Sequence, residues 1–251
     1  MKSFQGESRL LQPPSRWWLV LCVVLLLAGV GFLGVFGYEQ YGYLKSNRYY
    51  DELAQLSHQS TGEQSMSSID FAALEQINPG IAAWLEMPGL PLSLPVVQAQ
   101  DNDTYLHHSF DGSPSPCGCL FFSASSADSD LYRVIYGHNI HTGEMFAGLL
   151  QYQEESFYRE NPDFVLCTPE GDQTWHIFSC HSATDGEDLY RTDRTYGEAY
   201  DTFIQELSDV SDYDTGVDVP QNSRVLTLST CASSYGSGSE RYVIHAYLAE
   251  E

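Results

Sequence analysis

The first forty residues contain an uncharged, almost entirely apolar run from Leu19 to Gly37. As a helix rising about 1.5 Å per residue, this run extends roughly 28 Å, close to the thickness of the hydrocarbon core of a bilayer. Trp17 and Trp18 precede it and Tyr38 follows it, where aromatic side chains favour the membrane interface. The run therefore predicts a membrane-spanning helix, and any globular domain must follow it.

A cleaved signal peptide is the alternative to a permanent anchor. Its apolar region would be shorter and would be followed by a cleavage site of the Ala-x-Ala type. This run is long and no convincing site follows, which favours an uncleaved signal-anchor over residues 17–38. Three basic residues precede the span and two follow it closely, so we expect residues 1–16 in the cytoplasm and the remainder outside the cell.

The next segment is expected to connect the membrane to a folded domain. Helical periodicity continues from Glu39 to Ser57, and the polar stretch from His58 to Ser68 is typical of a linker. We therefore assign residues 39–68 to a stalk and linker, and residues 69–251 to the domain. Asp70 is placed to cap a short helix at the start of that domain.

Beyond Trp84 the sequence is dominated by short apolar runs rich in β-branched and aromatic residues. Eight short strands with few helices predict a mainly β fold closed into an eight-stranded barrel with peripheral helices. The expected strands cover residues 82–88, 94–99, 118–124, 131–137, 163–168, 173–182, 224–230 and 241–249. The expected helices after the first cover residues 104–109, 145–153, 155–160 and 196–208.

Charge is distributed unevenly along the chain. Residues 1–63 are neutral overall, whereas residues 64–251 contain six arginines, no lysine and 29 acidic residues. The domain therefore carries the whole net charge of −23. Because contacts to phosphates need a basic surface, this composition argues against a nucleic-acid partner. It also makes each arginine of the domain a candidate for a specific role.

The six cysteines do not form an obvious disulfide framework. Cys117 and Cys119 are too close in sequence to bridge comfortably, and Cys167 and Cys180 are not cross-strand neighbours in a simple hairpin register. We expect them to be buried or idle thiols. The C-x-C pair has two histidines nearby in sequence, but its spacing is not a standard zinc pattern, so we expect neither a metal site nor a cofactor.

Cys231 differs from the other cysteines because it ends a predicted strand beside an open loop of glycine and small residues. A cysteine nucleophile needs a base or charged partner and a donor for the developing oxyanion. His138 comes just after the predicted strand at 131–137, and Arg241 begins the last strand. Side chains from distant parts of the sequence converge at strand ends, so these three residues are our candidate catalytic group.

Seven segments of the domain stand out when taken together and in order. They are Ile69–Pro79, Trp84–Gly89, Leu94–Gln98, Asp101–Leu106, the YGHN of Tyr136–Asn139, the TLSTC of Thr227–Cys231 and Arg241–Ile244. Any one of them is a weak signal, but their common order from Ile69 to Leu248 is specific. In this order they make the chain similar to class B sortases, which are surface cysteine transpeptidases.

The resemblance implies an eight-stranded barrel and assigns roles to the three candidates. Cys231 would be the nucleophile, His138 the proton partner and Arg241 the donor to the oxyanion or to a substrate carbonyl. His141 is the nearest rival of His138, which is preferred because it occupies the histidine position of the YGHN segment. The expected substrate contacts at positions matching the family are Asn102, Leu106, Tyr136, Ser229 and Thr230.

The sequence departs from some class B members, which carry an acidic residue directly after the cysteine. Here Cys231 is followed by Ala232-Ser-Ser-Tyr235, so no local carboxylate is available as a third catalytic member. The segment from Tyr190 to Ser211, where such enzymes carry specificity, shows no motif that can be assigned.

Three functions remain open from the sequence. The first is a transpeptidase that cleaves an NP-x-T-x-like sorting signal of surface proteins and transfers them to a peptidoglycan amine. The second uses the same chemistry to polymerise pilins through a lysine of another subunit. The third is a non-catalytic adhesin or assembly protein, which would not need Cys231, His138 and Arg241 at three strand ends.

Overall fold

The computed structural model describes residues 16–58, 68–126, 131–231 and 238–249. The chain divides into two compact units, Met1–Gly42 and Tyr43–Glu251. Helix α1 (Arg16–His58) is continuous across this division. Within the described residues it is the one helix that is long and apolar enough to cross a membrane. Residues 1–15 of the expected cytoplasmic segment 1–16, and residues 59–67 of the expected linker, lie outside the described residues.

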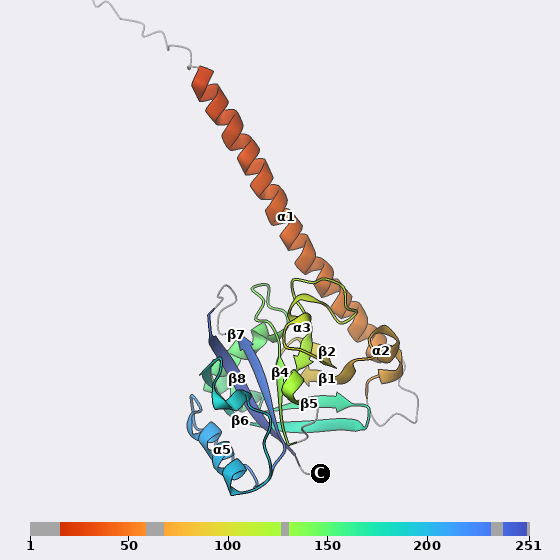
Figure 1. Cartoon of the computed structure of the whole chain (residues 1–251), viewed down its shortest axis with the longest axis vertical. Helices are drawn as coiled ribbons and strands as arrows, with labels where there is room; N and C mark the ends of the chain where they lie inside the picture. The colour runs from red at the N-terminus through yellow and green to blue at the C-terminus, as the bar shows by residue number, and fades with distance from the viewer. Residues whose placement is uncertain (1–15, 59–67, 127–130, 232–237, 250–251) are drawn as a thin grey trace, which may run out of the picture. The chain divides into compact units, whose positions relative to one another are not determined.

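The second unit is built on a closed barrel of eight strands (Figure 1). Their order around the barrel is β1-β2-β3-β4-β7-β8-β6-β5, and the pairs β2–β3 and β4–β7 are parallel while the others are antiparallel. The predicted mainly β, eight-stranded architecture is confirmed. The strands are β1 (Ile81–Met87), β2 (Leu92–Gln98), β3 (Leu120–Phe122), β4 (Tyr132–Tyr136), β5 (Asp163–Thr168), β6 (Gly171–Thr184), β7 (Val225–Cys231) and β8 (Glu240–Leu248).

Strand β7 is covered on both faces, because every residue from Val225 to Thr230 is buried. Leu226 and Leu228 of β7 belong to the main core, whereas Val225 of the same strand belongs to a second core. That second core includes Phe203 and Leu207 of helix α5 (Glu198–Asp209). One face of β7 therefore packs with the barrel core and the other with the segment between β6 and β7.

Local signals position the helices. Asp70 caps α2 (Phe71–Ile77) as expected, because its carboxylate accepts a hydrogen bond of 3.0 Å from the main-chain N–H of Ala73. The helix expected at 145–153 is instead the 3₁₀ helix η2 (Phe146–Gln153). The other elements are α3 (Thr104–His107), η1 (Ala124–Ser126), α4 (Glu155–Glu160) and η3 (Asp188–Tyr190).

Several boundaries differ by a few residues from the sequence expectation, and two of these differences follow from strand pairing. The helix expected at 104–109 ends at His107, because His108 pairs with Pro114 in an isolated bridge. Strand β6 is longer than expected and extends to Thr184, since its residues from Trp175 to Thr184 pair with β8. This extension brings the turn after β6 to the start of β8.

The part of α1 that follows Tyr43 belongs to the same compact unit as the barrel. Tyr50 donates a hydrogen bond of 2.7 Å to the carbonyl of Gly118 and accepts one of 3.2 Å from the main-chain N–H of Phe110. Ser46 bonds Ser115 at 3.1 Å. The segment expected as a stalk is thus fixed to the loop that precedes β3.

The cysteines behave as the sequence predicts. Cys117, Cys119, Cys167 and Cys180 are free and buried. Cys167 pairs with Asp172 across the β5–β6 hairpin, and Cys180 pairs with Ile244 of β8. Cys167 and Cys180 are therefore not cross-strand neighbours.

Candidate active site

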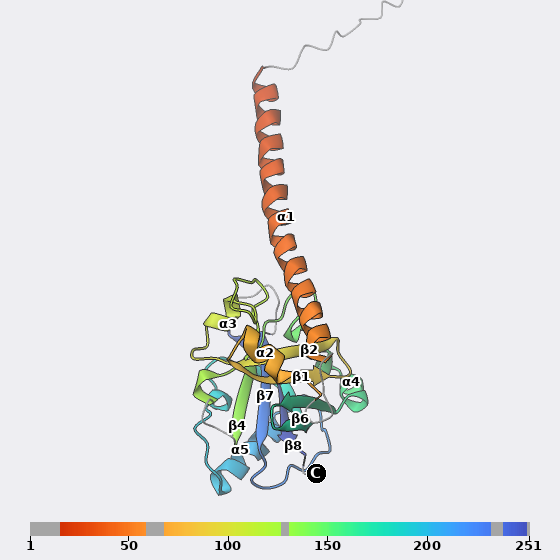
Figure 2. The same cartoon turned by 90° about the vertical axis from the view of Figure 1, so that its right-hand side faces the viewer.

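The three candidate catalytic residues lie at the ends of adjacent strands. Figure 2 shows β4 and β7 side by side, and their parallel register pairs Tyr136 with Ser229. The N–H of Gly137 extends this pairing with a hydrogen bond of 3.2 Å to the carbonyl of Ser229. On the other side of β7, Cys231 pairs with Arg241 of β8. The Cα atoms of directly opposed residues lie about 4.5–5.5 Å apart in such a ladder.

This register places the main chain of His138 and that of Arg241 on opposite sides of the end of β7. The side chain of Cys231 and the loop 232–237 lie outside the described residues. The topology therefore brings the three chain positions together, although they are separated by up to about a hundred residues in the sequence.

His138 is held from two directions. Its Nε2–H donates a hydrogen bond of 2.8 Å to the carbonyl of Leu106, and its own carbonyl accepts one of 2.8 Å from the N–H of Phe146. A neutral imidazole that donates through Nε2 keeps its lone pair on Nδ1. Nδ1 is therefore the ring atom that can accept a proton from a reacting group.

Gly118 leaves room for this arrangement. Its φ is +65°, which favours glycine, and a Cβ there would lie 2.5 Å from the carbonyl oxygen of Tyr105, 3.0 Å from that of Leu106 and 3.2 Å from Cδ2 of His138. The same glycine carbonyl accepts the hydrogen bond from Tyr50 of α1. Gly118 is thus a required part of the support under the histidine, and no sequence motif identified it.

Burial is the main cause that lowers the pKa of His138; the hydrogen bond to Leu106 acts in the opposite direction, and electrostatic interactions with His107 and Arg241 lower the pKa further. The imidazole is therefore held mainly neutral near pH 7. Protonating the ring is less favourable in the folded state than in the unfolded chain. The stability that the neutral His138 contributes is therefore fully present above the pKa that it has in the unfolded chain. It is lost as the pH falls through the lower pKa that it has in the folded state.

We expect an NMR titration of histidine ring protons to give His138 a midpoint below the ordinary imidazole value of about 6.5. The Cys231→Ala variant is the suitable sample because it removes coupling to the thiol. The signal is assigned by its loss in Cys231→Ala/His138→Gln. A midpoint at or above the ordinary value would contradict the neutral, Nε2-protonated imidazole.

Arg241 is half-buried and bound on several sides. Its Nη1 donates to the carbonyls of Gly238 at 2.9 Å and Glu240 at 3.1 Å, and its Nη2 donates to the carboxylate of Asp185. Asp185 belongs to the turn after β6. Sequence reasoning missed this carboxylate, because nothing in the local pattern links position 185 to position 241.

Tyr136 and Ser229 meet a third residue that the sequence did not assign. The ring of Tyr190 stacks on that of Tyr136 with a centroid distance of 6.0 Å, and its hydroxyl bonds Oγ of Ser229 at 3.1 Å. Tyr190 ends η3, in the segment between β6 and β7. This segment therefore contacts the β4 and β7 strands immediately before His138 and Cys231.

The other expected substrate contacts have clear structural roles. Asn102 is exposed, and its side-chain oxygen accepts a hydrogen bond of 2.8 Å from the N–H of Ala124. Leu106 is half-buried and orients His138 through its carbonyl. Thr230 is 2% exposed, and its hydroxyl forms no hydrogen bond with the described part of the chain.

Three other histidines have partners of their own. His141 is exposed and packs edge-on against Tyr43 with a centroid distance of 4.9 Å. His245 is fully buried and bonds Thr227 at 2.8 Å, while His176 pairs with Asp163. These contacts fit the structural roles expected for His245 and His176.

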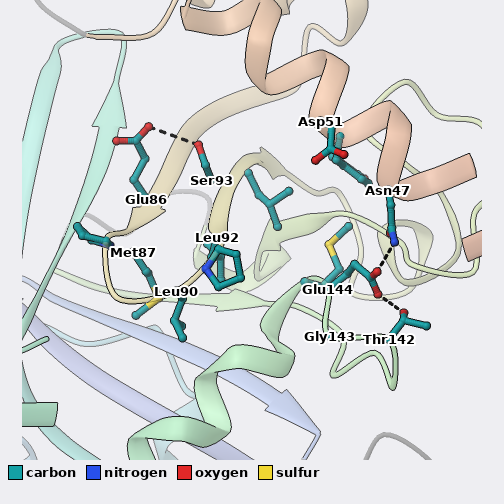
Figure 3. A pocket seen from close by; sticks show the side chains of 15 residues that line it. Asn47, Asp51, Glu86, Met87, Leu90, Leu92, Ser93, Thr142, Gly143 and Glu144 are labelled. Atoms are coloured by element: carbon teal, nitrogen blue, oxygen red, sulfur yellow. Dashed lines mark hydrogen bonds between the residues drawn. The ribbon is translucent and has the colours of Figure 1, made fainter. Parts of the chain in front are cut away.

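A cavity of about 700 Å³ lies between the lower part of α1, the β1–β2 turn and the loop 142–145 (Figure 3). Asp51, Glu86 and Glu144 give it an acidic rim, and Glu144 accepts hydrogen bonds from Asn47 and Thr142. None of the candidate catalytic residues lines this cavity, so we do not include it in the active site.

The chain is similar to known proteins in both sequence and fold. A sortase domain model matches residues 85–249. Sortase B of Staphylococcus aureus is 29% identical over 178 residues, covering 70% of this chain and 73% of that protein. The structure of sortase B from B. anthracis in complex with AAEK1 has a TM-score of 0.74 at 27% identity, covering 84% of this chain and 99% of that one. Sortase B of Clostridium perfringens has a TM-score of 0.66 at 31% identity, covering 72% and 100%.

The matched region contains the barrel from Leu85 of β1 onward, including the strand ends at which His138, Cys231 and Arg241 lie. The chain therefore belongs to the sortase family, within class B, and is a cysteine transpeptidase.

Proposed function

We propose that this transpeptidase cleaves an NP-x-T-x-like sorting signal through a thioacyl-enzyme on Cys231 and transfers the surface protein to a peptidoglycan amine. The observation that carries the proposal is the register of β4, β7 and β8, which puts His138 and Arg241 on opposite sides of the end of β7. A peptide crossing this end could meet a nucleophile, a proton carrier and a cation at once.

In the first step, Sγ of Cys231 forms a bond to the threonine carbonyl carbon and the thiol proton passes to Nδ1 of His138. Arg241 donates to the oxygen on which negative charge develops, since its charged, planar guanidinium suits such an acceptor. The bond to the leaving amine then breaks, and His138 gives its proton to that amine. The products are a thioester on Cys231 and the released C-terminal fragment.

The second step reverses these roles. The amine of the acceptor attacks the thioester carbonyl, its proton passes to His138, and the C–S bond breaks. The thiolate then regains the proton from His138, so the enzyme returns to its starting state. The neutral state of His138 that burial favours is the one that can accept a proton from the amine.

The substrate is proposed to contact the positions that match the family. Tyr136 and Ser229, together with Tyr190, form one wall beside the two strand ends. Asn102 and Leu106 come from the loop that supports His138. Thr230 has a buried side chain, so its contact would be made through the main chain.

We also propose the place of action. Residues 17–38 would anchor the protein in the cell membrane as a single span, with residues 1–16 in the cytoplasm and the barrel outside. The support is the length and apolar character of α1 and the excess of basic residues before the span. This arrangement would present the barrel to both surface proteins and peptidoglycan precursors.

The test is turnover of a fluorogenic Asn-Pro-x-Thr-x peptide with and without a small peptidoglycan-like amine, at low and high ionic strength. The amine is expected to increase turnover and to appear in the product, because a positioned amine competes with water for the thioester. Salt is expected to weaken the amine effect more than basal hydrolysis, since the domain's net charge of −23 attracts the cation.

Each alternative has its own result. If only hydrolysed peptide appears and the amine changes nothing, a peptidase function replaces transfer to peptidoglycan. If a lysine-containing pilin subunit is joined while the peptidoglycan-like amine is not, the enzyme polymerises pilins. An amine effect that is equal at all salt concentrations would leave transfer standing but would remove the role of the acidic surface.

A further inference from the structure

A carboxylate from a distant segment binds the guanidinium of Arg241. Asp185 follows β6 directly and pairs with Nη2 of Arg241. We propose that Asp185 is a positioning residue that holds Arg241 in the orientation needed to bind the substrate oxygen. The inference rests on the proposed function, because it assumes that Arg241 acts on the substrate.

The position of Asp185 is determined by the sheet. In the β6–β8 ladder, Ala183 pairs with Arg241 and Thr184 pairs with Glu240. The main-chain N–H of Asp185 then donates a hydrogen bond of 2.9 Å to the carbonyl of Ser239. Asp185 therefore continues the ladder by one residue, two positions after the residue that lies directly opposite Arg241.

The turn that follows keeps this residue in place. The N–H of Thr184 donates to the carboxylate of Glu187 at 2.6 Å, and the N–H of Glu187 donates to the carbonyl of Thr184 at 3.2 Å. Gly186 between them has a φ of +87°, which lets the chain reverse direction at once. The carboxylate thus comes from a hydrogen-bonded turn on a long strand.

The hydrogen bonds of Arg241 leave a defined part of its guanidinium for a ligand. Gly238 and Glu240 accept from Nη1, and Asp185 accepts from Nη2. Nε–H and the second hydrogen of Nη2 form no hydrogen bond with a described residue. An N–H group of the guanidinium that no other residue binds can donate to a carbonyl or oxyanion.

An ion pair with a half-exposed carboxylate contributes little to the stability of the fold. We therefore expect Asp185 to act by orienting the guanidinium of Arg241. The side chain of Asp185 is 49% exposed and that of Arg241 is 19% exposed. A free arginine side chain samples many rotamers, whereas a guanidinium bound at three points presents one edge. Asp185 would thereby supply, from the segment after β6, a carboxylate that is missing after Cys231. It would act through Arg241, without touching the sulfur or His138.

The experiment measures kcat and KM of the full-length enzyme for the fluorogenic Asn-Pro-x-Thr-x peptide in five variants. Asp185→Asn is expected to lower kcat about tenfold or more, since a small misplacement of a catalytic group has effects of this size. KM is expected to change less than about threefold. Asp185→Glu keeps the charge and is expected to recover part of the lost kcat, which a purely structural role would not produce.

The matched control is Asp193→Asn. Asp193 pairs with Arg191 in the same β6–β7 segment, at 3.2 Å, and is 72% exposed. Its loss is expected to leave kcat within about twofold of the wild type. Thermal melts of all variants check that any loss of kcat is not a loss of folded protein.

A double-mutant cycle with Arg241→Lys separates the inference from the proposed function. Lysine lacks the planar fork, so Asp185→Asn is expected to lower kcat by less than about twofold in the Arg241→Lys background. If Arg241→Lys lowers kcat but Asp185→Asn does not, the positioning role is wrong while the catalytic role of Arg241 stands. The same conclusion follows if the double variant loses kcat by the product of the two single losses. If Arg241→Lys keeps full kcat, both are wrong.

Discussion

Replacing Cys231 by alanine is expected to abolish thioacyl-enzyme formation. The same replacement at Cys117, Cys119, Cys167 or Cys180 is expected to leave thioacyl-enzyme formation intact. The thiolate is the reactive form, and burial raises the pKa of Cys119, Cys167 and Cys180 to about 12 and that of Cys117 above its ordinary value. These four thiols are therefore protonated at neutral pH. Cys231 ends a strand between the positions of His138 and Arg241.

Intact-mass spectrometry after mixing with the sorting peptide measures the adduct directly. The four control variants are expected to retain it, with only the modest loss of stability that follows truncation of a buried side chain. Peptide cleavage and amine transfer that persist in Cys231→Ala would show that another group is the nucleophile, and the mechanism would then be wrong.

Gly118→Ala is expected to reduce turnover strongly, by about a hundredfold, although it replaces none of the reacting groups. The new Cβ would lie within 3.2 Å of the carbonyl oxygens of Tyr105 and Leu106 and of Cδ2 of His138. The Leu106 carbonyl and the ring must then shift, and a displacement near 1 Å can reduce the rate about a hundredfold. The measurement is kcat/KM with the sorting peptide, together with the NMR position of His138.

Gly112→Ala is the matched control for backbone strain. Its φ of +77° resembles the +65° of Gly118, but an added Cβ there meets nothing within 4 Å. Both substitutions carry the cost of about 1 kcal/mol for an L-residue in the left-handed region. Only Gly118→Ala adds the steric conflict. Equal kcat/KM in the two variants would mean that the support under His138 is unimportant for catalysis.

Much of the architecture was predictable because it depends on local patterns. An apolar run of bilayer length predicts a helix irrespective of its context, and α1 covers it. Short β-branched and aromatic runs predicted all eight strands to within a few residues. The cap at Asp70 depends on a contact only three residues away, so it also followed from the sequence. Long-range pairing decided the exceptions, such as the length of β6.

The candidate catalytic residues could be named from the sequence, but their arrangement could not. Strand-end positions and the TLSTC and YGHN segments selected Cys231, His138 and Arg241. The order of strands in the closed sheet places β7 between β4 and β8, and this is a property of pairings between distant segments. No local pattern states which strand ends are neighbours, because strand pairing is settled by the packing of the whole barrel.

The contacts that tune those residues depended on the tertiary structure alone. The Leu106 carbonyl sets the tautomer of His138, Gly118 makes room beneath the ring, and Asp185 binds Arg241. Tyr190 joins Tyr136 and Ser229 in the same way. These partners are a main-chain oxygen, a glycine without a Cβ and side chains that lie far away in the sequence. The sequence by itself determined the residues that can do the chemistry, and the folded barrel decided their neighbours, because a hydrogen bond depends on distance in space.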